Sequence, residues 1–482
     1  MFWNLENTAP DLPAVIDDVS GRTFSYSEIK SKCVKINPFI NFGSKKLIFS
    51  FCDNSVESII IYLSALRSGN AVFLVNTKMD SGLKQSLINI YKPEIIFSVD
   101  DITEFLNDSF IRAHGYDKVE IDEKYSIHLS KNHLDSTPPH PDLAVLLSTS
   151  GTTGSPKLVK LTFGNIQSNA EAISQYLDIT GDETPITSLP MHYSFGLSVI
   201  NSHLLKGAKI VCTNKSMVMR EFWNTFNRYN CTSFSGVPYN YQMLQRLKFD
   251  KMDLPSLKTM TQAGGRLSEE FIKYFYEITV KKGIRFFVMY GQTEATARIS
   301  YVPYEKLGDK IGSIGVPIPN GRIKIFSDEN EITSPSVQGE LVYYGKNVMM
   351  GYAERKDDLS KDDELHGILH TGDLAYKDDE GFYYITGRLK RFIKLFGLRV
   401  NLDEIEKLIE NQFGAATACY GGDDSLKILI QSHDSGILEH VKRKVTDTYK
   451  IHHSVLFLNC IDAIPVTASG KKDYTLIQKM GY

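Results

Sequence analysis

The stretch TSGTTGSPK, residues 149–157, offers hydroxyl groups, bare backbone and one cation, and it has no side chain suited to a core. Every residue from 148 to 155 is Ser, Thr or Gly, and Lys157 follows after Pro156. Glycine lets backbone N–H groups turn toward an anion, hydroxyls add donors, and Lys157 adds positive charge. The stretch therefore predicts a phosphate-binding loop, with a flexible connector as the alternative interpretation. It lacks the GxxxxGK[ST] spacing of a Walker A loop.

A second segment, YGQTEAT at residues 290–296, combines an aromatic ring, a hydroxyl and a carboxylate. An aromatic face can stack on a base, and a hydroxyl can bond a phosphate. A carboxylate can hold Mg²⁺, a hard cation that takes oxygen ligands and shares them with phosphate. The alternative interpretation is an N-capping Thr followed by a Glu in the first turn of a helix.

The elements that must hold these segments follow from the hydrophobic pattern, in which short apolar runs alternate with amphipathic stretches. Strands are predicted at 46–51, 71–75, 94–99, 143–148, 208–212, 232–236, 258–264 and 285–291. Helices are predicted at 55–69, near 81–90 and at 165–177. This alternation predicts a parallel sheet with helices on both faces, in which ligands bind at the carboxyl ends of strands. We expect the hydroxyl-rich loop to follow a strand and to precede a helix.

The pattern changes near residue 310, where strands with Gly and Pro turns follow one another without helices. This predicts a small β-rich subdomain or barrel. Past residue 390 the pattern is mixed again and predicts a separate α+β domain of roughly a hundred residues. Its expected elements are a helix at 402–413, strands at 415–420 and 426–430, a helix at 436–449 and a strand at 454–458.

Composition narrows the class of protein. A chain of 482 residues is too long for one core, so two or more domains are expected. The formal net charge of −3 offers no polybasic signal for nucleic acid or anionic lipid. The six cysteines include no CxxC pair and the twelve histidines no HExxH motif, so neither a disulfide framework nor a zinc site is expected. The N-terminus lacks a signal-peptide pattern and no apolar run reaches the length of a membrane span. We therefore expect a soluble, cytoplasmic protein.

Several segments, taken in order, resemble the signatures of the adenylate-forming superfamily of acyl-CoA synthetases, non-ribosomal adenylation domains and luciferases. TSGTTGSPK resembles its phosphate loop, and YGQTEAT resembles its Tyr-Gly-x-Thr-Glu motif. The stretch 369–406, which contains TGD and GRLK, resembles its nucleotide-binding and hinge region, and PVTASGKKDY at 465–474 resembles its C-terminal lysine motif. The resemblance spans roughly residues 20–475 and includes several motifs in the same order, so it does not arise by chance.

The resemblance implies a role for each matching position. Lys471 would bridge the substrate carboxylate and the α-phosphate of ATP, since one ammonium can offset the charge that builds at phosphorus. Thr293 would bond the α-phosphate, and Glu294 would hold Mg²⁺. Asp373 would accept both ribose hydroxyls, as a bidentate carboxylate can. The other implied ATP- and AMP-binding residues are Thr149, Ser150, Gly151, Thr152, Thr153, Gly154, Lys157, Gly265, Arg266, Tyr290, Gly291, Gln292 and Arg388.

The same resemblance implies an acyl pocket and a moving domain. LPMHYSFGLS, residues 189–198, would line the acyl pocket through Tyr193, with Val237 and Gly265 also facing it; an aromatic turn in the core is the alternative interpretation. Lys390 would be the hinge, and the loop at Gly397 would swing in to form a thiol tunnel. The implied fold class is α/β. The resemblance implies that residues 1–388 form a large N-terminal domain of two doubly wound subdomains plus a β-barrel subdomain, and that residues 389–482 form a mobile α+β lid.

This chain departs from the family pattern at several positions. Tyr193 stands where His is usual, and Leu158 follows Lys157 where Gly is usual. Phe163 replaces a usual His, and Arg391 stands where an acidic residue is usual in the hinge.

The implied reaction is a two-step ligation. A small carboxylic acid attacks the α-phosphate of ATP to give an acyl-adenylate and pyrophosphate, and a thiol then attacks the adenylate to give a thioester and AMP. Coenzyme A is the first choice of thiol. The alternative is the phosphopantetheine of a separate acyl or peptidyl carrier protein, and a second alternative is a nucleotide-binding protein without ligase activity.

Overall fold

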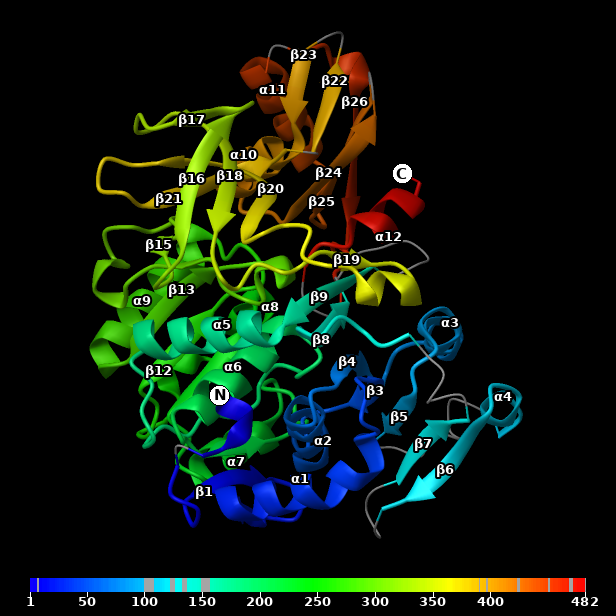
Figure 1. The fold of residues 1–482 in the computed structure, drawn as a ribbon. Helices are drawn as coiled ribbons and strands as arrows, with labels where there is room; N and C mark the ends of the chain where they lie inside the picture. Colours follow the sequence, from blue (N-terminus) through cyan, green and yellow to red (C-terminus); the bar gives the residue numbers. More distant parts are fainter. Residues whose placement is uncertain are drawn as a thin grey trace.

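The computed structural model describes most of the chain (Figure 1). The described residues are 1–6, 8–98, 108–121, 126–131, 137–148, 157–389, 391–395, 398–422, 425–449, 451–467 and 471–481. The N-terminal elements, blue and green in Figure 1, form the larger part of the molecule, and the orange and red C-terminal elements lie at its top. Among the described residues, no helix is long and apolar enough to cross a lipid bilayer.

The first large sheet has eight strands in the order β19-β9-β8-β4-β3-β5-β7-β6. Its centre is parallel, and the outer pairs are antiparallel. The strands are β3 (Leu47–Cys52), β4 (Ala71–Asn76), β5 (Ile95–Ser98), β6 (Tyr116–Glu120), β7 (Ser126–Ser130), β8 (Leu143–Ser148), β9 (Leu158–Thr162) and β19 (Tyr352–Ala353). The helices of this part are α1 (Tyr26–Ile40), α2 (Val56–Arg67), α3 (Ser81–Tyr91) and α4 (Asp108–Ala113).

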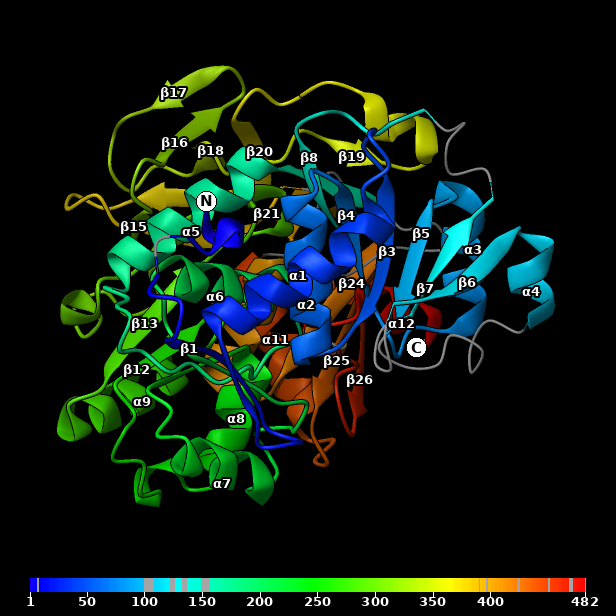
Figure 2. The same ribbon diagram turned by 60° about the horizontal axis from the view of Figure 1, so that its bottom comes forward.

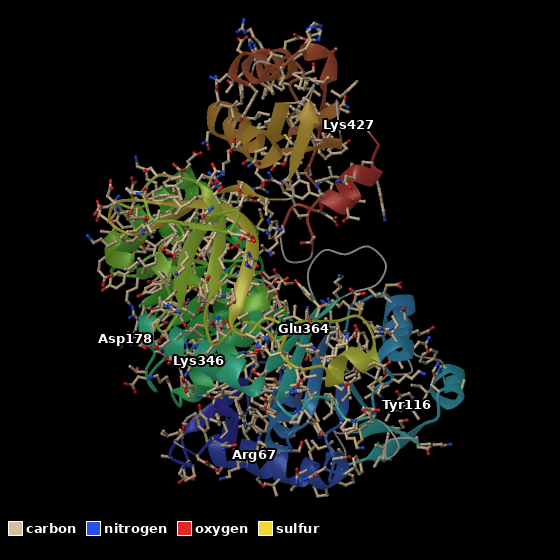
Figure 3. The ribbon with its side chains drawn as sticks, turned by 45° about the horizontal axis from the view of Figure 1, so that its top comes forward. Arg67, Tyr116, Asp178, Lys346, Glu364 and Lys427 are labelled. Atoms are coloured by element: carbon tan, nitrogen blue, oxygen red, sulfur yellow. The ribbon has the colours of Figure 1, made fainter. Side chains whose placement is uncertain are left out.

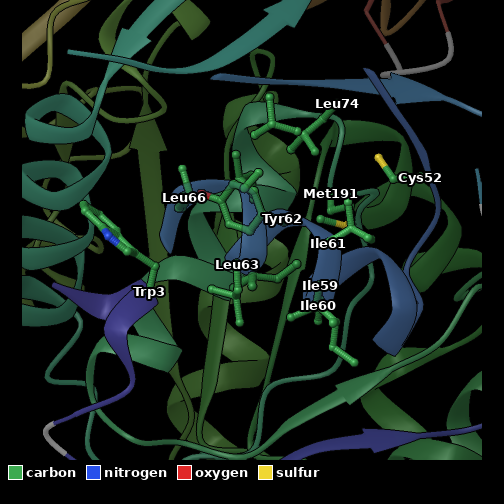
Figure 4. Packing of buried hydrophobic residues seen from close by; sticks show 14 of the residues in the cluster. Trp3, Cys52, Ile59, Ile60, Ile61, Tyr62, Leu63, Leu66, Leu74 and Met191 are labelled. Atoms are coloured by element: carbon green, nitrogen blue, oxygen red, sulfur yellow. The ribbon is translucent and has the colours of Figure 1, made fainter. Parts of the chain in front are cut away.

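Alternation along β3 explains why helices cover both faces of this sheet. Ile48 belongs to the core cluster that includes α2, whereas Phe49 and Phe51 belong to the cluster that includes α3. Successive side chains of a strand point to opposite faces, so an apolar strand needs cover on both. Figure 2 shows α1 and α2 over one face of β3 and β4, and Figure 4 shows the α2 side chains Ile59 to Leu63 packed in that core.

The hydroxyl-rich loop begins at the carboxyl end of β8, as predicted, but it precedes a strand and not a helix. β9 pairs antiparallel with β8, and α5 (Phe163–Tyr176) begins only after β9. Thr162 caps α5, because its hydroxyl accepts the N–H of Asn165 and the Asn165 side chain returns to the Thr162 N–H. The expectation of a direct loop-to-helix connection was therefore wrong.

The second sheet joins parallel strands to an antiparallel edge in the order β11-β12-β13-β14-β15. Phe286 and Val288 of β13 pack toward one core cluster, and Phe287 and Met289 pack toward another that contains residues of α5 and α6. Isolated parallel bridges at Pro185 and Ile186 connect this sheet to the sheet β10-β1-β2. The strands are β1 (Pro13–Asp17), β2 (Thr23–Ser25), β10 (Ile210–Cys212), β11 (Ser233–Gly236), β12 (Thr259–Gln262), β13 (Arg285–Tyr290), β14 (Ser300–Tyr301) and β15 (Val316–Pro317). The helices are α6 (Ser194–Leu205), α7 (Arg220–Arg228), α8 (Pro238–Arg246) and α9 (Glu269–Lys282).

The predicted β-rich region forms a third, antiparallel sheet of five strands in the order β17-β16-β18-β20-β21. Its register places Asp373 directly opposite Arg388 across the β20–β21 pair. The strands are β16 (Arg322–Ser327), β17 (Asn330–Ile332), β18 (Gly339–Tyr344), β20 (Ile368–Lys377) and β21 (Tyr383–Arg388).

The C-terminal elements have hydrophobic clusters of their own, built from residues between 393 and 477. Figure 3 shows them standing over the rest of the molecule, with Lys427 labelled among them. The strands are β22 (Phe392–Leu395), β23 (Leu398–Asn401), β24 (Thr417–Gly422), β25 (Ser425–Gln431) and β26 (Leu456–Ile461). The helices are α10 (Leu402–Phe413), α11 (Ile437–Tyr449) and α12 (Tyr474–Lys479).

Candidate active site

The segment after β13 folds back tightly on itself. A Cβ on Gly291 would lie 1.9 Å from the Ala297 carbonyl oxygen, so only glycine fits there. Thr296 adopts φ 62° and ψ −57°, and the Ala297 N–H bonds the Ala295 carbonyl at 2.6 Å. This is a γ-turn, a rare and strained conformation for a β-branched residue. The turn sends Thr293 and Glu294 to one side and brings Arg298 back into the interior.

Asp373 is the centre of a buried polar cluster at the end of β13. Its side chain is almost fully buried, and it accepts hydrogen bonds from the Tyr290 hydroxyl and, at 3.0 Å, from the Gln292 amide. The Arg388 guanidinium pairs with its other oxygen at 3.1 Å. Burial and the adjacent Asp373 carboxylate raise the pKa of Tyr290, so its hydroxyl stays a donor. Four residues that the resemblance assigned to nucleotide binding therefore meet at one place.

Glu294 lies on the side of the site that also carries Lys157. Its carboxylate accepts a 2.8 Å hydrogen bond from the Tyr352 hydroxyl. The Lys157 ammonium lies 5.8 Å from the centre of the Tyr352 ring and pairs with Glu354 at 2.7 Å. The Thr293 hydroxyl lies 3.2 Å from that of Ser194, at the start of α6. Lys157, at the end of the hydroxyl-rich loop, and Glu294 are thus linked through one tyrosine.

Lys471 comes from the C-terminal elements and lines the same pocket as Tyr193, Gly291 and Thr293. A short hairpin holds it, since the Thr467 N–H bonds the Lys471 carbonyl at 2.7 Å. Burial and the positive Arg388 lower the pKa of the Lys471 ammonium, while the carboxylates of Glu294 and Asp373 oppose that shift. Lys471 therefore lines one pocket with Gly291 and Thr293 of the YGQTEAT segment, which lie more than a hundred residues away in sequence.

Two adjoining pockets share Phe195 and Arg298 in their linings. The smaller, of about 270 Å³, is the one that Lys471 faces. The larger, of about 420 Å³, runs between α5, α6 and the strands β11 to β13, and apolar side chains such as Ile173 and Met289 line much of it. Because the two pockets share lining residues, an acid whose carboxylate faces Lys471 would extend toward the larger one.

Not every predicted residue lies in these pockets. Tyr193 lines the smaller one, but Val237 is not among its described lining residues and instead packs behind Tyr193 and Gly264. Ala263 and Gly264 line the pocket, whereas the neighbouring Gly265 carbonyl accepts the Gln262 amide at 2.9 Å. Arg266 lies half-exposed, 3.9 Å from Glu269. Thr149, Ser150, Gly151, Thr152, Thr153, Gly154, Lys390 and Gly397 lie outside the described residues.

Sequence reasoning missed three residues of the site: Ser194, Arg298 and Tyr352. Each is close to a predicted residue only in three dimensions. Tyr352 is 58 positions from Glu294, and Ser194 is 99 positions from Thr293. For Arg298 the sequence offered one signal, a charged residue two positions after the YGQTEAT motif.

The hinge region contains an unexpected ionic network centred on Glu406 of α10. Arg391 and Lys472 both pair with Glu406 at 2.8 Å, and the Tyr474 hydroxyl bonds it at 2.8 Å. Arg391 also pairs with Asp403, and its guanidinium lies 3.8 Å from the centre of the Tyr474 ring. Arg391, which stands where an acidic residue was expected, is therefore tied to the residue next to Lys471.

Comparison with known proteins agrees with the predicted family. A family model described as AMP-binding enzyme matches residues 2–353. The chain belongs to the AMP-binding enzyme family. Among curated members, a long-chain-fatty-acid–CoA ligase of Escherichia coli O157:H7 is 31% identical over 350 residues, which are 68% of this chain and 60% of that ligase. A 2-succinylbenzoate–CoA ligase of Bacillus velezensis is 27% identical over 480 residues, 96% of this chain and 94% of that ligase.

Solved structures of the family confirm the α/β fold class. An o-succinylbenzoate coenzyme A synthetase of Bacillus subtilis, in complex with ATP and magnesium ion, has a TM-score of 0.76 at 23% identity and covers 99% of this chain and 98% of its own. An anthranilate CoA ligase in complex with anthranoyl-AMP has a TM-score of 0.80 at 17% identity, and the match covers 99% of this chain and 96% of that ligase. The fold is therefore shared over nearly the whole chain.

Proposed function

We propose that this chain is an AMP-forming acid–CoA ligase. One observation carries the proposal: Lys471 of the C-terminal part lines a pocket together with Gly291, Gln292 and Thr293. The Asp373 cluster lies beside it, and its carboxylate acts on the pKa of Lys471. The two curated relatives described above are both named as acid–CoA ligases, and this supports the same class of reaction.

In the first half-reaction a carboxylate oxygen of the acid attacks the α-phosphorus of ATP, and the bond to pyrophosphate breaks. The Lys471 ammonium lies between the two anions and stabilises the charge that builds on the phosphoryl oxygens. The Thr293 hydroxyl bonds the α-phosphate. Asp373 accepts the ribose hydroxyls, with Arg388 and Gln292 holding the carboxylate in place. Positioning and electrostatics supply most of the catalysis, as in other phosphoryl chemistry.

The residues present fit a magnesium ion that is shared with ATP. Glu294 offers a carboxylate, and the phosphates would complete an all-oxygen donor set, which Mg²⁺ prefers. Within the described part of the chain, no group of three or more His, Cys, Asp or Glu is placed to hold a metal. When bound, the ion would neutralise phosphate charge. Tyr352 fixes the Glu294 carboxylate in place.

In the second half-reaction the C-terminal part turns about Lys390, Lys471 leaves, and the segment at Gly397 helps admit the thiol. The thiol sulfur attacks the acyl carbon of the adenylate, its proton is lost, and AMP departs. The loop 149–154 with Lys157 binds the outer phosphates of ATP. Coenzyme A is the proposed acceptor. The phosphopantetheine of a carrier protein is the alternative, and a protein without ligase activity is the third hypothesis.

The decisive experiment is ATP–pyrophosphate exchange over a panel of carboxylic acids, followed by a thiol acceptor assay. Exchange with at least one acid and formation of its CoA thioester are the expected results. Exchange with thioester formation only on a carrier protein would reject CoA as the acceptor. Absence of exchange with every acid, in protein shown to be folded by circular dichroism, would reject the ligase proposal.

A further inference from the structure

Arg298 is a buried cation, and no carboxylate among the described residues pairs with it. Its side chain is 3% exposed, and it lines both pockets. Its Nη1 donates to the Ala297 carbonyl at 3.2 Å, and its Nε has no hydrogen-bond partner among the described residues. One face of the guanidinium lies 3.9 Å from the centre of the Phe195 ring. Buried polar groups in proteins are nearly always paired, so this one needs an explanation.

The other charged groups around the larger pocket do not neutralise Arg298. Glu183 lines that pocket, but it is engaged by Arg285 at 3.6 Å and by the Thr232 hydroxyl. Burial lowers the pKa of His203, and its Nδ1 lies 2.7 Å from the Val199 carbonyl. The remaining neighbours of Arg298 are the hydroxyls of Tyr176 and Tyr193, of which the Tyr176 hydroxyl also hydrogen-bonds the guanidinium; both are neutral groups and supply no counter-charge. As far as the described residues show, the pocket therefore carries one unmatched positive charge, since arginine stays protonated in proteins.

From this arrangement we infer that the acid activated by this enzyme carries a second carboxylate, which Arg298 binds in the acyl pocket. The inference rests on the proposed ligase function and specifies its substrate class. The smaller pocket, with Lys471, takes the carboxylate that reacts with ATP. The Nε edge of a guanidinium is shaped to bind a carboxylate through two parallel hydrogen bonds. The Phe195 ring packs on the guanidinium, and the apolar part of the lining, which includes Ile173 and Met289, suits the carbon skeleton between the two carboxylates.

Arg298 is also placed to distinguish a dicarboxylic acid from a monocarboxylic one. A monocarboxylic acid of equal length would leave the charge of the buried guanidinium without a counter-ion and its Nε without a hydrogen-bond partner, and a site built to bond a polar group rejects an analogue that lacks it. The γ-turn at Thr296 holds the chain so that Arg298 points inward, and Asn347 fixes the turn by bonding the carbonyls of Ala295 and Arg298 at 2.8 Å each. The cation is therefore held in place and cannot leave for solvent.

The test compares matched acids in ATP–pyrophosphate exchange: succinate, glutarate, adipate and phthalate against butyrate, valerate, hexanoate and benzoate. The wild-type protein is expected to favour the dicarboxylic member of the best pair by about a hundredfold or more in kcat/KM. R298M is expected to lose that preference, and R298K to retain part of it, since lysine keeps the charge without the paired donors. Equal use of both members, or a preference for the monocarboxylic acids, would overturn the inference while leaving the ligase function intact.

A thermal-unfolding series provides a readout that does not depend on turnover. Dicarboxylic acids should raise the Tm of the wild-type protein and not that of R298M. Without ligand, R298M should be at least as stable as wild type, because an uncompensated buried charge is removed. The matched control is K160M: Lys160 is an equally buried cation, but its ammonium donates to the carbonyls of Asp358 and Lys361 at 3.1 and 3.3 Å. K160M should lower the Tm.

The two readouts separate the two proposals. If no acid supports exchange but dicarboxylic acids stabilise wild type selectively, the ligase function fails and the second-carboxylate site stands. If exchange occurs and R298M unfolds as readily as K160M with unchanged acid preference, Arg298 is structural and the inference is wrong.

Discussion

At the scale of single residues, the ammonium of Lys471 is the group on which adenylation should depend most. K471A is expected to lower the rate of ATP–pyrophosphate exchange by about a hundredfold or more, because the ammonium that would face the α-phosphate in this pocket is lost, and Arg298, the other cation in its lining, is assigned to the second carboxylate of the acid. K479A is the matched control, since Lys479 lies exposed on the following helix α12. Transfer from a pre-formed acyl-adenylate to CoA should survive in K471A. An exchange rate equal to that of K479A would reject the role of Lys471.

The pH dependence of adenylation should report the environment of Lys471. Burial and Arg388 lower the pKa of its ammonium, so the charge is lost at a lower pH than for an exposed lysine. As pH rises through that lowered pKa, kcat/KM for adenylation should fall, and K471R should remove this alkaline limb because arginine stays charged. The measurement is the pH profile of kcat/KM for ATP. An alkaline limb that is unchanged in K471R would assign it to another group.

Asp373 should contribute to ATP binding more than to the chemical step. D373N removes the charge that Arg388 and the Tyr290 hydroxyl face. A hydrogen bond to a charged group contributes about 1.5–3 kcal/mol, so KM for ATP should rise roughly tenfold to a hundredfold, with a smaller change in kcat. D379N, at the exposed turn between β20 and β21, is the control and should behave as wild type. A fall in kcat alone would contradict the binding role.

At the scale of elements, the network around Glu406 of α10 connects two segments. One contains Arg391, next to the predicted hinge at Lys390, and the other contains Lys472, the residue after Lys471. E406Q leaves the cations of Arg391 and Lys472 without a carboxylate between them. Breaking a buried ion pair costs about 3 kcal/mol or more, so the C-terminal elements should unfold at lower denaturant concentration. Protection of the backbone amides of α10 and α12 from hydrogen exchange would measure this.

Exposed Glu439 on α11 supplies the matched control, E439Q, which should leave that protection unchanged. E406Q should also reduce adenylation, because Lys472 adjoins Lys471. If E406Q had normal stability and full adenylation activity, the network would not be needed to position Lys471.

Elements were predicted best where they are long and strongly patterned. The helix predicted at 402–413 and the strand predicted at 143–148 match α10 and β8 at both ends. β9 was missed because Leu158–Thr162 is short and follows a polar loop, and its strand state depends on pairing with β8. Pairing across a sheet is a long-range interaction that a local pattern does not contain.

At the scale of the whole molecule, we propose that the orientation of the C-terminal part selects the half-reaction. With Lys471 in the pocket, the structure has the arrangement proposed for adenylation. Lys390 lies outside the described residues, and its role as the hinge stays a prediction. The substitution K390P would fix φ at that position and so prevent the C-terminal part from rotating about it. We expect K390P to retain pyrophosphate exchange and to lose thioester formation, with K390A retaining both. Thioester formation by K390P would place the hinge elsewhere.

The division into residues 1–388 and 389–482 and the cytoplasmic location also stay predictions. The separate hydrophobic clusters of residues 393–477 support the first. Limited proteolysis that releases a C-terminal fragment beginning near residue 389 is the expected outcome for a two-domain chain.

The sequence by itself determined the family, the fold class and the order of the motifs, because these depend on local patterns and on residue types that few other arrangements use. It also named Tyr290, Gln292, Asp373 and Arg388, which the structure brings into one cluster. Only the tertiary structure decided what the pocket contains besides these motifs. The burial of Arg298 without a counter-charge and the link from Tyr352 to Glu294 arise from contacts between distant segments. Burial is a property of the packed chain, so a charge that is ordinary in sequence becomes a determinant of specificity only when the fold removes it from water.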